Sequence, residues 1–182
     1  MWRRLVAICL LLVSFSVTAC STSPTGELKS YVDSRSGYEF LYPNGWIPVE
    51  VSGNGPDLVM RDLIERSENL SVVIGDIPEG ESLQDLGTPT EVGQNIAKTA
   101  ISNATANRQA ELVSVGSKET PEHTYYLLEY KVDFSDRESR HNLASVAVSR
   151  GKLFTFNIST PERRWKKMQD KFQAVVNSFS VY

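Results

Sequence analysis

Residues 141–162 read HNLASVAVSRGKLFTFNISTPE, and this stretch indicates how the chain folds. Apolar side chains alternate along residues 141–149, as on the two faces of a strand, and residues 153–158 form a second strand-like run. Arg150-Gly151-Lys152 between the two runs is typical of a tight hairpin turn. The stretch therefore predicts two neighbouring antiparallel strands.

The same stretch ends at the expected start of a helix. Thr160 is expected to cap the helix, Pro161 to lie in its first turn and Glu162 to lie near the positive end of its dipole. Apolar residues then recur at spacings of three and four, which predicts a helix face buried on a sheet rather than a cofactor-binding face. These residues are Trp165, Met168, Phe172, Val175, Val176 and Phe179.

The preceding sequence alternates between strand signals and one further helix signal. Strands are expected over residues 38–42, 46–51, 58–60, 70–74, 111–115 and 124–132. Thr88-Pro89-Thr90-Glu91 is typical of a capping box and predicts a helix over about residues 89–103. Because short turns join most strands and helices interrupt them twice, we expect an α+β domain with a mostly antiparallel sheet.

The N-terminus has the order of an export signal. Arg3 and Arg4 precede the apolar run 5–13, and the segment ends in Val17-Thr18-Ala19-Cys20, which looks like a bacterial lipobox. We expect residues 1–19 to be a lipoprotein signal peptide, Cys20 to carry a lipid, residues 20–27 to include a short linker and residues 28–182 to form one domain. A membrane-spanning anchor and signal cleavage without lipidation are the alternatives, although the apolar run is short for a spanning helix.

Composition excludes several classes of function. The chain has 182 residues and a formal charge of -3, and removal of residues 1–19 leaves 17 basic and 22 acidic residues, a charge of -5. This balance argues against a general nucleic-acid-binding protein. The two cysteines are Cys9 and Cys20, so residues 28–182 contain no thiol for a disulfide, for thiol catalysis or for a cysteine-based zinc site.

No catalytic motif supports an enzyme. Gly53-Asn54-Gly55 lacks the third glycine of a dinucleotide-binding turn, and neither a Walker sequence nor a Gly-x-Ser-x-Gly elbow is present. The two histidines, His123 and His141, have no histidine at metal-binding spacing. A Ser-His-Asp triad assembled in space stays open, but no motif favours it.

His141 and Glu162 are the best candidates for a site. In a hairpin centred on Gly151, residue 141 faces residue 161, so we expect these two side chains to lie close together. An imidazole and a carboxylate at one point can share a proton or bind a divalent ion. The alternative is a simple surface hydrogen bond or ion pair.

A second candidate is the basic cluster around Trp165. Arg163, Arg164, Lys166 and Lys167 are expected to spread over the outward faces of the final helix while Trp165 points inward. Such a cluster is either an ordinary solvated face or a docking site for an acidic partner or lipid headgroups.

Several segments, in order along the chain, resemble the PsbP family. They are Asp33, Gly37 to Pro43 with Gly45-Trp46, Leu83 to Pro89 with Val92-Gly93, Tyr125 to Tyr130, Arg140 to Leu143, Gly151 to Phe154, Arg164-Trp165 and Ser178 to Val181. Combined with the lipobox, they resemble the cyanobacterial lipoprotein form of that family. The resemblance implies an αβα sandwich around an antiparallel sheet, as in PsbP and Mog1-like proteins.

The resemblance also implies a function. Family members are extrinsic lumenal proteins of photosystem II, so we expect a non-catalytic, lipid-anchored protein on the lumenal side of the thylakoid membrane that supports assembly or stability of the photosystem. Its expected partners are lumenal subunits or assembly intermediates of photosystem II and the membrane, and we expect a monomer. A metal- or small-ligand-binding membrane-tethered lipoprotein unrelated to the photosystem is the alternative.

Family residues implicated in ion binding fall on His141 and Glu162, where the family's acid is aspartate and this chain has glutamate. No cofactor is expected to be required, and a weakly bound calcium, zinc or manganese ion is the expected ligand. Plant members carry an ordered N-terminal extension that acts on the photosystem. Here residues 21–27 alone separate Cys20 from the first expected strand, so the lipid is expected to localise the protein instead.

Overall fold

The computed structural model describes residues 28–51, 53, 55–102 and 107–182. The expected signal peptide, Cys20 and the linker lie outside these residues. The elements in order are β1 (Leu28–Asp33), β2 (Tyr38–Pro43), β3 (Trp46–Pro48), β4 (Leu58–Asp62), β5 (Asn69–Asp76), α2 (Pro89–Ile96), η2 (Ala97–Ile101), β6 (Arg108–Glu119), β7 (Thr124–Phe134), β8 (Arg140–Ser149), β9 (Lys152–Pro161), α3 (Glu162–Asn177) and β10 (Ser180–Val181).

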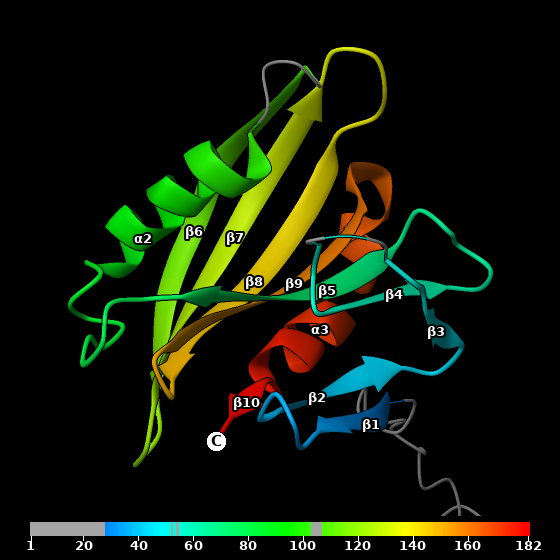
Figure 1. Ribbon diagram of the computed structural model, residues 1–182. Helices are drawn as coiled ribbons and strands as arrows, with labels where there is room; N and C mark the ends of the chain where they lie inside the picture. The colour runs from blue at the N-terminus through cyan, green and yellow to red at the C-terminus, as the bar shows by residue number, and fades with distance from the viewer. Residues whose placement is uncertain (1–27, 52, 54, 103–106) are drawn as a thin grey trace, which may run out of the picture.

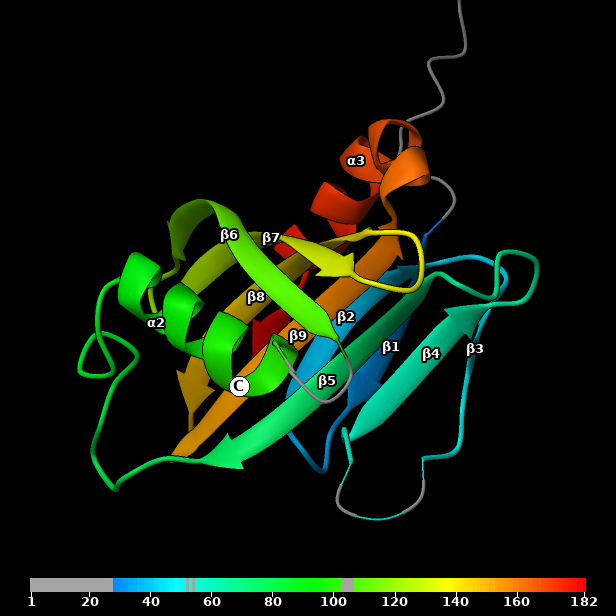
Figure 2. The ribbon, with the colours of Figure 1, turned by 90° about the horizontal axis from the view of Figure 1, so that it is seen from above.

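A seven-stranded sheet in the order β3-β4-β5-β9-β8-β7-β6 forms the centre of the domain (Figure 1). Every pair of strands in it is antiparallel. Helix α2 contacts β6 and β7, whereas α3 contacts mainly β8 and β9, and strands β7 to β9 run between the two helices (Figure 2). The α+β class and the layered arrangement of helices around an antiparallel sheet are confirmed.

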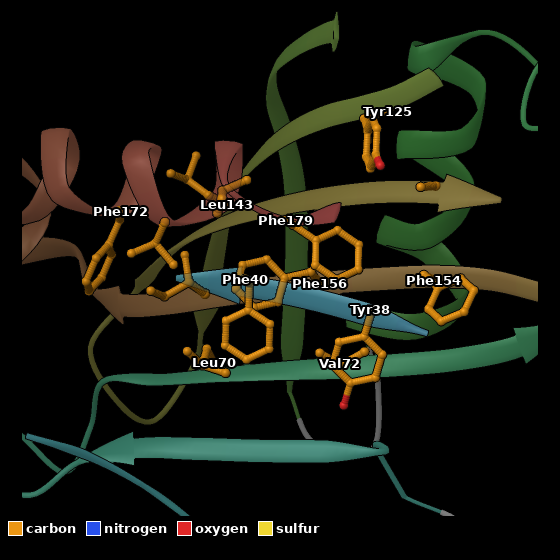
Figure 3. Close-up of a cluster of buried hydrophobic side chains, with 14 of the residues drawn as sticks. Tyr38, Phe40, Leu70, Val72, Tyr125, Leu143, Phe154, Phe156, Phe172 and Phe179 are labelled. Atoms are coloured by element: carbon orange, nitrogen blue, oxygen red, sulfur yellow. The ribbon is translucent and has the colours of Figure 1, made fainter. Parts of the chain in front are cut away.

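A second sheet was not anticipated. Strands β1, β2 and β10 form a three-stranded antiparallel sheet of their own on the side of the large sheet that carries α3. Phe40 of β2 packs on Phe156 of β9 with ring centroids 4.7 Å apart, and Phe156 stacks on Phe179 just after α3 at 5.0 Å (Figure 3). Alternation of side chains identified β2 as a strand, but it carries no information on which sheet the strand joins.

Alternation along β7 and β8 divides the apolar residues between two cores. Tyr125 and Leu143 belong to the core beneath α3 and the small sheet, and Tyr126 and Val146 belong to the core beneath α2. The expected assignment of residues on β8 to two faces is confirmed. The buried stripe of the final helix is confirmed for Phe172, Val175 and Val176, which are buried, and for Trp165 and Met168, which pack beside them. Phe179 is buried as well, but it lies beyond the end of α3 at Asn177.

The capping box of the first helix is confirmed. The Thr88 hydroxyl accepts a hydrogen bond from Glu91 N at 3.3 Å, and Glu91 Oε2 accepts from Thr88 N at 2.8 Å. The last turn differs from expectation, because a π-helix, η2, follows α2 and ends on a hydrogen bond from Ser102 N to Ala97 O at 2.7 Å. The expected end at residue 103 lies outside the described residues.

Gly93 lets α2 approach the sheet closely. A Cβ atom at this position would lie 3.0 Å from a methyl carbon of Leu112 and 3.2 Å from one of Leu128. The buried Tyr130 hydroxyl also donates to Gly93 O at 3.0 Å. The helix is therefore fixed on β6 and β7 by close packing together with a buried hydrogen bond.

The expected cap of the final helix is wrong. Strand β9 extends to Pro161 and pairs Thr160 with His141 and Pro161 with Arg140, so neither residue lies in the helix. The Thr160 hydroxyl donates to the buried carboxylate of Glu68 at 2.8 Å, and Pro161 is the cap residue but provides no capping side chain. Sheet pairing and a buried acceptor hold Thr160 in the strand, and α3 begins at Glu162.

Strand lengths also differ from expectation. Strand β3 ends at Pro48 rather than at residue 51. It lies at one end of the large sheet, an edge position that tolerates proline because its missing N–H is not needed there. Strand β6 covers Arg108–Glu119 and includes a register shift between Leu112 and Ser114. This shift interrupts the alternation of apolar and polar side chains along the strand. The strand is therefore longer than the range 111–115 that the sequence predicted.

We expect Glu91→Gln to alter the pH dependence of stability. Hydrogen bonds from Thr88 N and the Thr88 hydroxyl hold the pKa of Glu91 below its ordinary value of 4.5. A carboxyl with a lowered folded-state pKa stabilises the fold above its unfolded pKa, and this contribution disappears as the pH falls through the folded value. Urea unfolding at pH 7 and pH 3 should show that the wild type loses more stability on acidification than Glu91→Gln. An identical loss in both proteins would contradict this account of the cap.

Candidate functional site

The candidate site lies where β8 begins and α3 follows β9. In the β8–β9 hairpin, His141 pairs with Thr160, so Glu162 lies just beyond the end of the pairing. His141 Nδ1 is 3.0 Å from Glu162 Oε2. The predicted proximity of these two side chains is confirmed, and the expected register differs from the observed one by a single residue.

Trp165 covers the imidazole. Its ring lies parallel to the His141 ring, with centroids 3.8 Å apart and an angle of 8° between the planes. Glu162 and Trp165 are three residues apart on α3 and therefore lie on the same side of the helix. Stacking leaves the His141 side chain only 7% exposed.

Glu129 completes the cluster and was missed in the sequence. His141 Nε2 lies 2.7 Å from Glu129 Oε1. Lys131 of β7 pairs with His141, and Glu129, two residues earlier, projects from the same face of the strand. The sequence did contain a sign of this role. Glu129 is an acidic residue within the aromatic and β-branched run 124–132, and it lies on the same face of the strand as Tyr125 and Leu127.

The cluster is suited to holding α3 against the sheet rather than to chemistry on a substrate. Ionised carboxylates accept hydrogen bonds, so His141 satisfies Glu129 and Glu162 together only when both ring nitrogens carry protons. Bonds to β7 on one side and to α3 on the other fix the ring, and Trp165 closes its face. A reacting group or a ligand would have to displace one of the carboxylates.

The described residues do not fit a resident metal ion at this position. The two carboxylates are held by opposite ring nitrogens, and a metal ligand must present a nitrogen without a proton. No group of three or more His, Cys, Asp and Glu side chains that could hold a metal ion occurs within the described ranges. Weak binding of a divalent ion by His141 and Glu162 therefore stays a prediction.

A second polar cluster lies beside the first and includes a fully buried acid. Glu68 has no exposed surface, and its Oε1 accepts from Arg164 Nε at 2.6 Å and from the Thr160 hydroxyl at 2.8 Å. Arg164 Nη1 also lies 3.8 Å from Glu65 Oε2. The hydrogen bond with Glu68 raises the pKa of Arg164. This bonding ties the segment before β5 to the end of β9 and to α3.

The four basic residues of the cluster around Trp165 do not form one patch. Arg164 turns toward Glu68, and Arg163 forms an ion pair with Glu138. Lys166 and Lys167 are exposed on α3. Trp165 is half-buried, and it points inward as expected. Docking through this helix stays a prediction that now concerns mainly the two lysines.

Comparison with known proteins gives consistent matches. The family model described as PsbP matches residues 26–181. CyanoP of Synechocystis sp. is 49% identical over 179 residues, which cover 97% of this chain and 95% of that protein. CyanoP of Thermosynechococcus vestitus is 43% identical over 175 residues, which cover 94% of this chain and 95% of that protein.

Solved structures give a similar result. The solution structure of CyanoP from Synechocystis sp. PCC 6803 has a TM-score of 0.75 and 48% identity, and the match covers 91% of this chain and 99% of that one. A variant of the protein Mog1 has a TM-score of 0.57 at 11% identity, with 85% of this chain and 95% of that chain covered. The likeness to Mog1 concerns the fold alone.

We expect His141→Ala to lower the free energy of unfolding by about 2 kcal/mol, because it removes the stacked ring and leaves two carboxylates without their donor. Chemical denaturation measures this change. His123→Ala serves as the control, since His123 lies in the turn before β7, where its backbone hydrogen bonds with Thr120 are kept in the variant and its ring makes an edge contact with Tyr125. Its effect should stay below about 0.5 kcal/mol. Equal losses in the two variants would contradict a holding role for His141.

The same cluster predicts how calcium binds. Calorimetric titration of calcium should give an affinity no tighter than millimolar, and Glu162→Gln, which removes the charge but retains the shape, should weaken that binding further. Tight binding that is lost in Glu162→Gln would show that an ion is part of the site.

Proposed function

Because this chain belongs to the PsbP family, we propose that it is a non-catalytic extrinsic protein of photosystem II that supports assembly or stability of the complex. One observation carries the proposal, namely 49% identity with CyanoP over nearly the whole of both chains. Because family members act on the lumenal side of the thylakoid membrane, we place this protein there as well.

The geometry of the polar cluster favours a binding role over catalysis. His141 is the side chain best suited to transfer protons near neutral pH, yet both of its ring nitrogens face carboxylates and Trp165 covers its ring. A general base must reach the proton that it removes. Held in this way, the imidazole stabilises the junction between sheet and helix.

A lipid on Cys20 would hold the protein at the membrane. The export signal and the Val17-Thr18-Ala19-Cys20 order support this assignment. Within the described residues, no helix is long and apolar enough to cross a bilayer. Confinement to a surface raises the effective concentration at a membrane-bound partner, so a weak and transient interface suffices.

The tether predicts how cysteine variants distribute in a cyanobacterial host. Cys20→Ala should move the protein from washed membranes to the soluble fraction, because the lipid attachment point is lost. Cys9→Ala is the matched control, since it alters a cysteine inside the expected signal, and it should leave the protein on membranes. Immunoblotting of the two fractions measures the result. Retention of Cys20→Ala on membranes would contradict lipid anchoring through this residue.

Docking would use the exposed lysines of α3. Lys166 and Lys167 are adjacent and exposed, whereas the expected mature chain carries a charge of -5. A local positive region on an acidic protein can orient it toward an acidic surface. These lysines follow the first turn of α3, which is held by the contacts of Glu162 with His141 and of Arg164 with Glu68. Their position on the protein is therefore well defined.

Affinity purification from gently solubilised thylakoid membranes tests the proposed function. A tagged copy should recover photosystem II chains. Recovery with incomplete, inactive complexes would assign an assembly role, and recovery with oxygen-evolving complexes would assign a resident stabilising role. Recovery of no photosystem chains would contradict the proposal and favour the ligand-binding lipoprotein instead.

Charge reversal in the same experiment tests the docking face. Lys166→Glu with Lys167→Glu should reduce the recovered photosystem chains by at least about threefold, because a loss of about 0.7 kcal/mol suffices for that change. Lys29→Glu with Lys98→Glu is the control, since both lysines are exposed and neither lies on α3. Equal reduction by the two pairs would show that net charge, rather than the α3 face, controls docking.

A further inference from the structure

A polar pocket lies at the end of the large sheet where β7 ends and β8 begins. This end of the two strands is at the top of Figure 1. The volume of the pocket is about 690 Å³, within the range of small-molecule sites. Five arginines from separate segments line it, namely Arg66, Arg108, Arg137, Arg140 and Arg163. Glu65 and Glu138 are its acidic residues, which leaves an excess of three positive charges.

The protein provides few direct ion pairs for these arginines. Glu138 pairs with Arg163, and Glu65 accepts from the Ser67 hydroxyl and lies near Arg164 outside the pocket lining. Among the described residues, no carboxylate forms an ion pair with Arg66, Arg108, Arg137 or Arg140. The pocket is therefore a concentrated positive region on a chain whose net charge is negative.

Arg140 is held in place by neutral groups. Its Nε donates to the Ser159 hydroxyl at 2.8 Å and its Nη2 donates to Ser67 O at 2.6 Å. Burial, with the nearby charge of Arg137 as a smaller cause, lowers the pKa of Arg140, although the charges of Glu68 and Glu65 partly oppose this shift. The Arg137 guanidinium lies 4.1 Å from the centre of the Phe134 ring. Both cations are thus positioned before any ligand arrives.

Arg108 presents an unsatisfied donor at the same pocket. Its Nε is buried and has no hydrogen-bond partner within the part of the chain that the structure describes. A buried donor without a partner is unfavourable, and a charged donor more so. Because Arg108 also lines the pocket, an anion bound there would offset the unfavourable burial of its charge.

We propose that this pocket binds a small molecule or headgroup that carries a phosphate or sulfate group. Guanidinium groups recognise oxyanions through paired hydrogen bonds. The arginines approach from β6, β8, α3 and the segments before β5 and β8, so they surround the space from several sides. A tetrahedral oxyanion offers acceptors in several directions, whereas a carboxylate offers two in one plane. The volume leaves room for an organic group beside the oxyanion.

Binding of inorganic phosphate to the purified protein tests the proposal. Arginine Nε–H resonances are followed by NMR during titration with phosphate, sulfate, acetate and chloride at equal ionic strength. Phosphate and sulfate should shift the Arg108 and Arg140 resonances in a saturable way, and acetate and chloride should not. Arg108→Gln should weaken phosphate binding at least tenfold. The exposed Arg61→Gln, with the same loss of charge outside the pocket, should leave it unchanged.

Further arms keep the test decisive. Arg137→Gln should also weaken phosphate binding. Because Arg137 is exposed, its substitution should not disturb the fold, so a loss of binding in this variant could not be attributed to misfolding. Saturable binding of glycerol 3-phosphate would identify the ligand as a soluble phosphate ester. Selective binding to phosphatidylglycerol vesicles would identify it as a lipid headgroup. Either result supports the proposal. Unsaturable shifts, equal weakening in Arg108→Gln and Arg61→Gln, or acetate binding as tight as phosphate would overturn it.

Discussion

The carboxylate of Glu68 is fully buried, and the junction between sheet and helix is organised around it. Removing a carboxylate from water is unfavourable unless a cation and hydrogen-bond donors replace the water. Arg164 and Thr160 supply them at Oε1, one from α3 and the other from β9, whereas the buried Oε2 has no hydrogen-bond partner among the described residues. Since both partners belong to consecutive elements, the bond fixes the point where the strand ends and the helix begins.

Other features of this junction follow from that fixed start. Successive residues of an α-helix point about 100° apart, so the first turn of α3 sends its side chains in different directions. Glu162 and Trp165 meet His141, Arg164 meets Glu68, and Arg163 turns toward Glu138. Lys166 and Lys167 then lie outward. The proposed docking face thus depends on buried polar contacts.

Local sequence patterns predicted the features that depend on neighbouring residues. The turn at Gly151 fixed the register that brings His141 to Glu162, and the Thr88 capping box marked the start of α2 correctly. Features that depend on distant partners were missed. Thr160 looked like a cap because its acceptor, Glu68, lies 92 positions away in the sequence. Glu129 and the separate sheet formed by β1, β2 and β10 were missed for the same reason, because strand order is not a property of one strand.

A double-mutant cycle on Glu68 and Arg164 tests most directly whether this buried pair holds the helix in place. The free energy of unfolding is measured for Glu68→Gln, Arg164→Gln, the double variant and the wild type. Our account predicts that the two losses are not additive, with a coupling energy of about 2 kcal/mol, because the second substitution removes a group that the first has already left unpaired. Losses that add to within about 0.5 kcal/mol would show that the two residues act independently, and they would contradict the account.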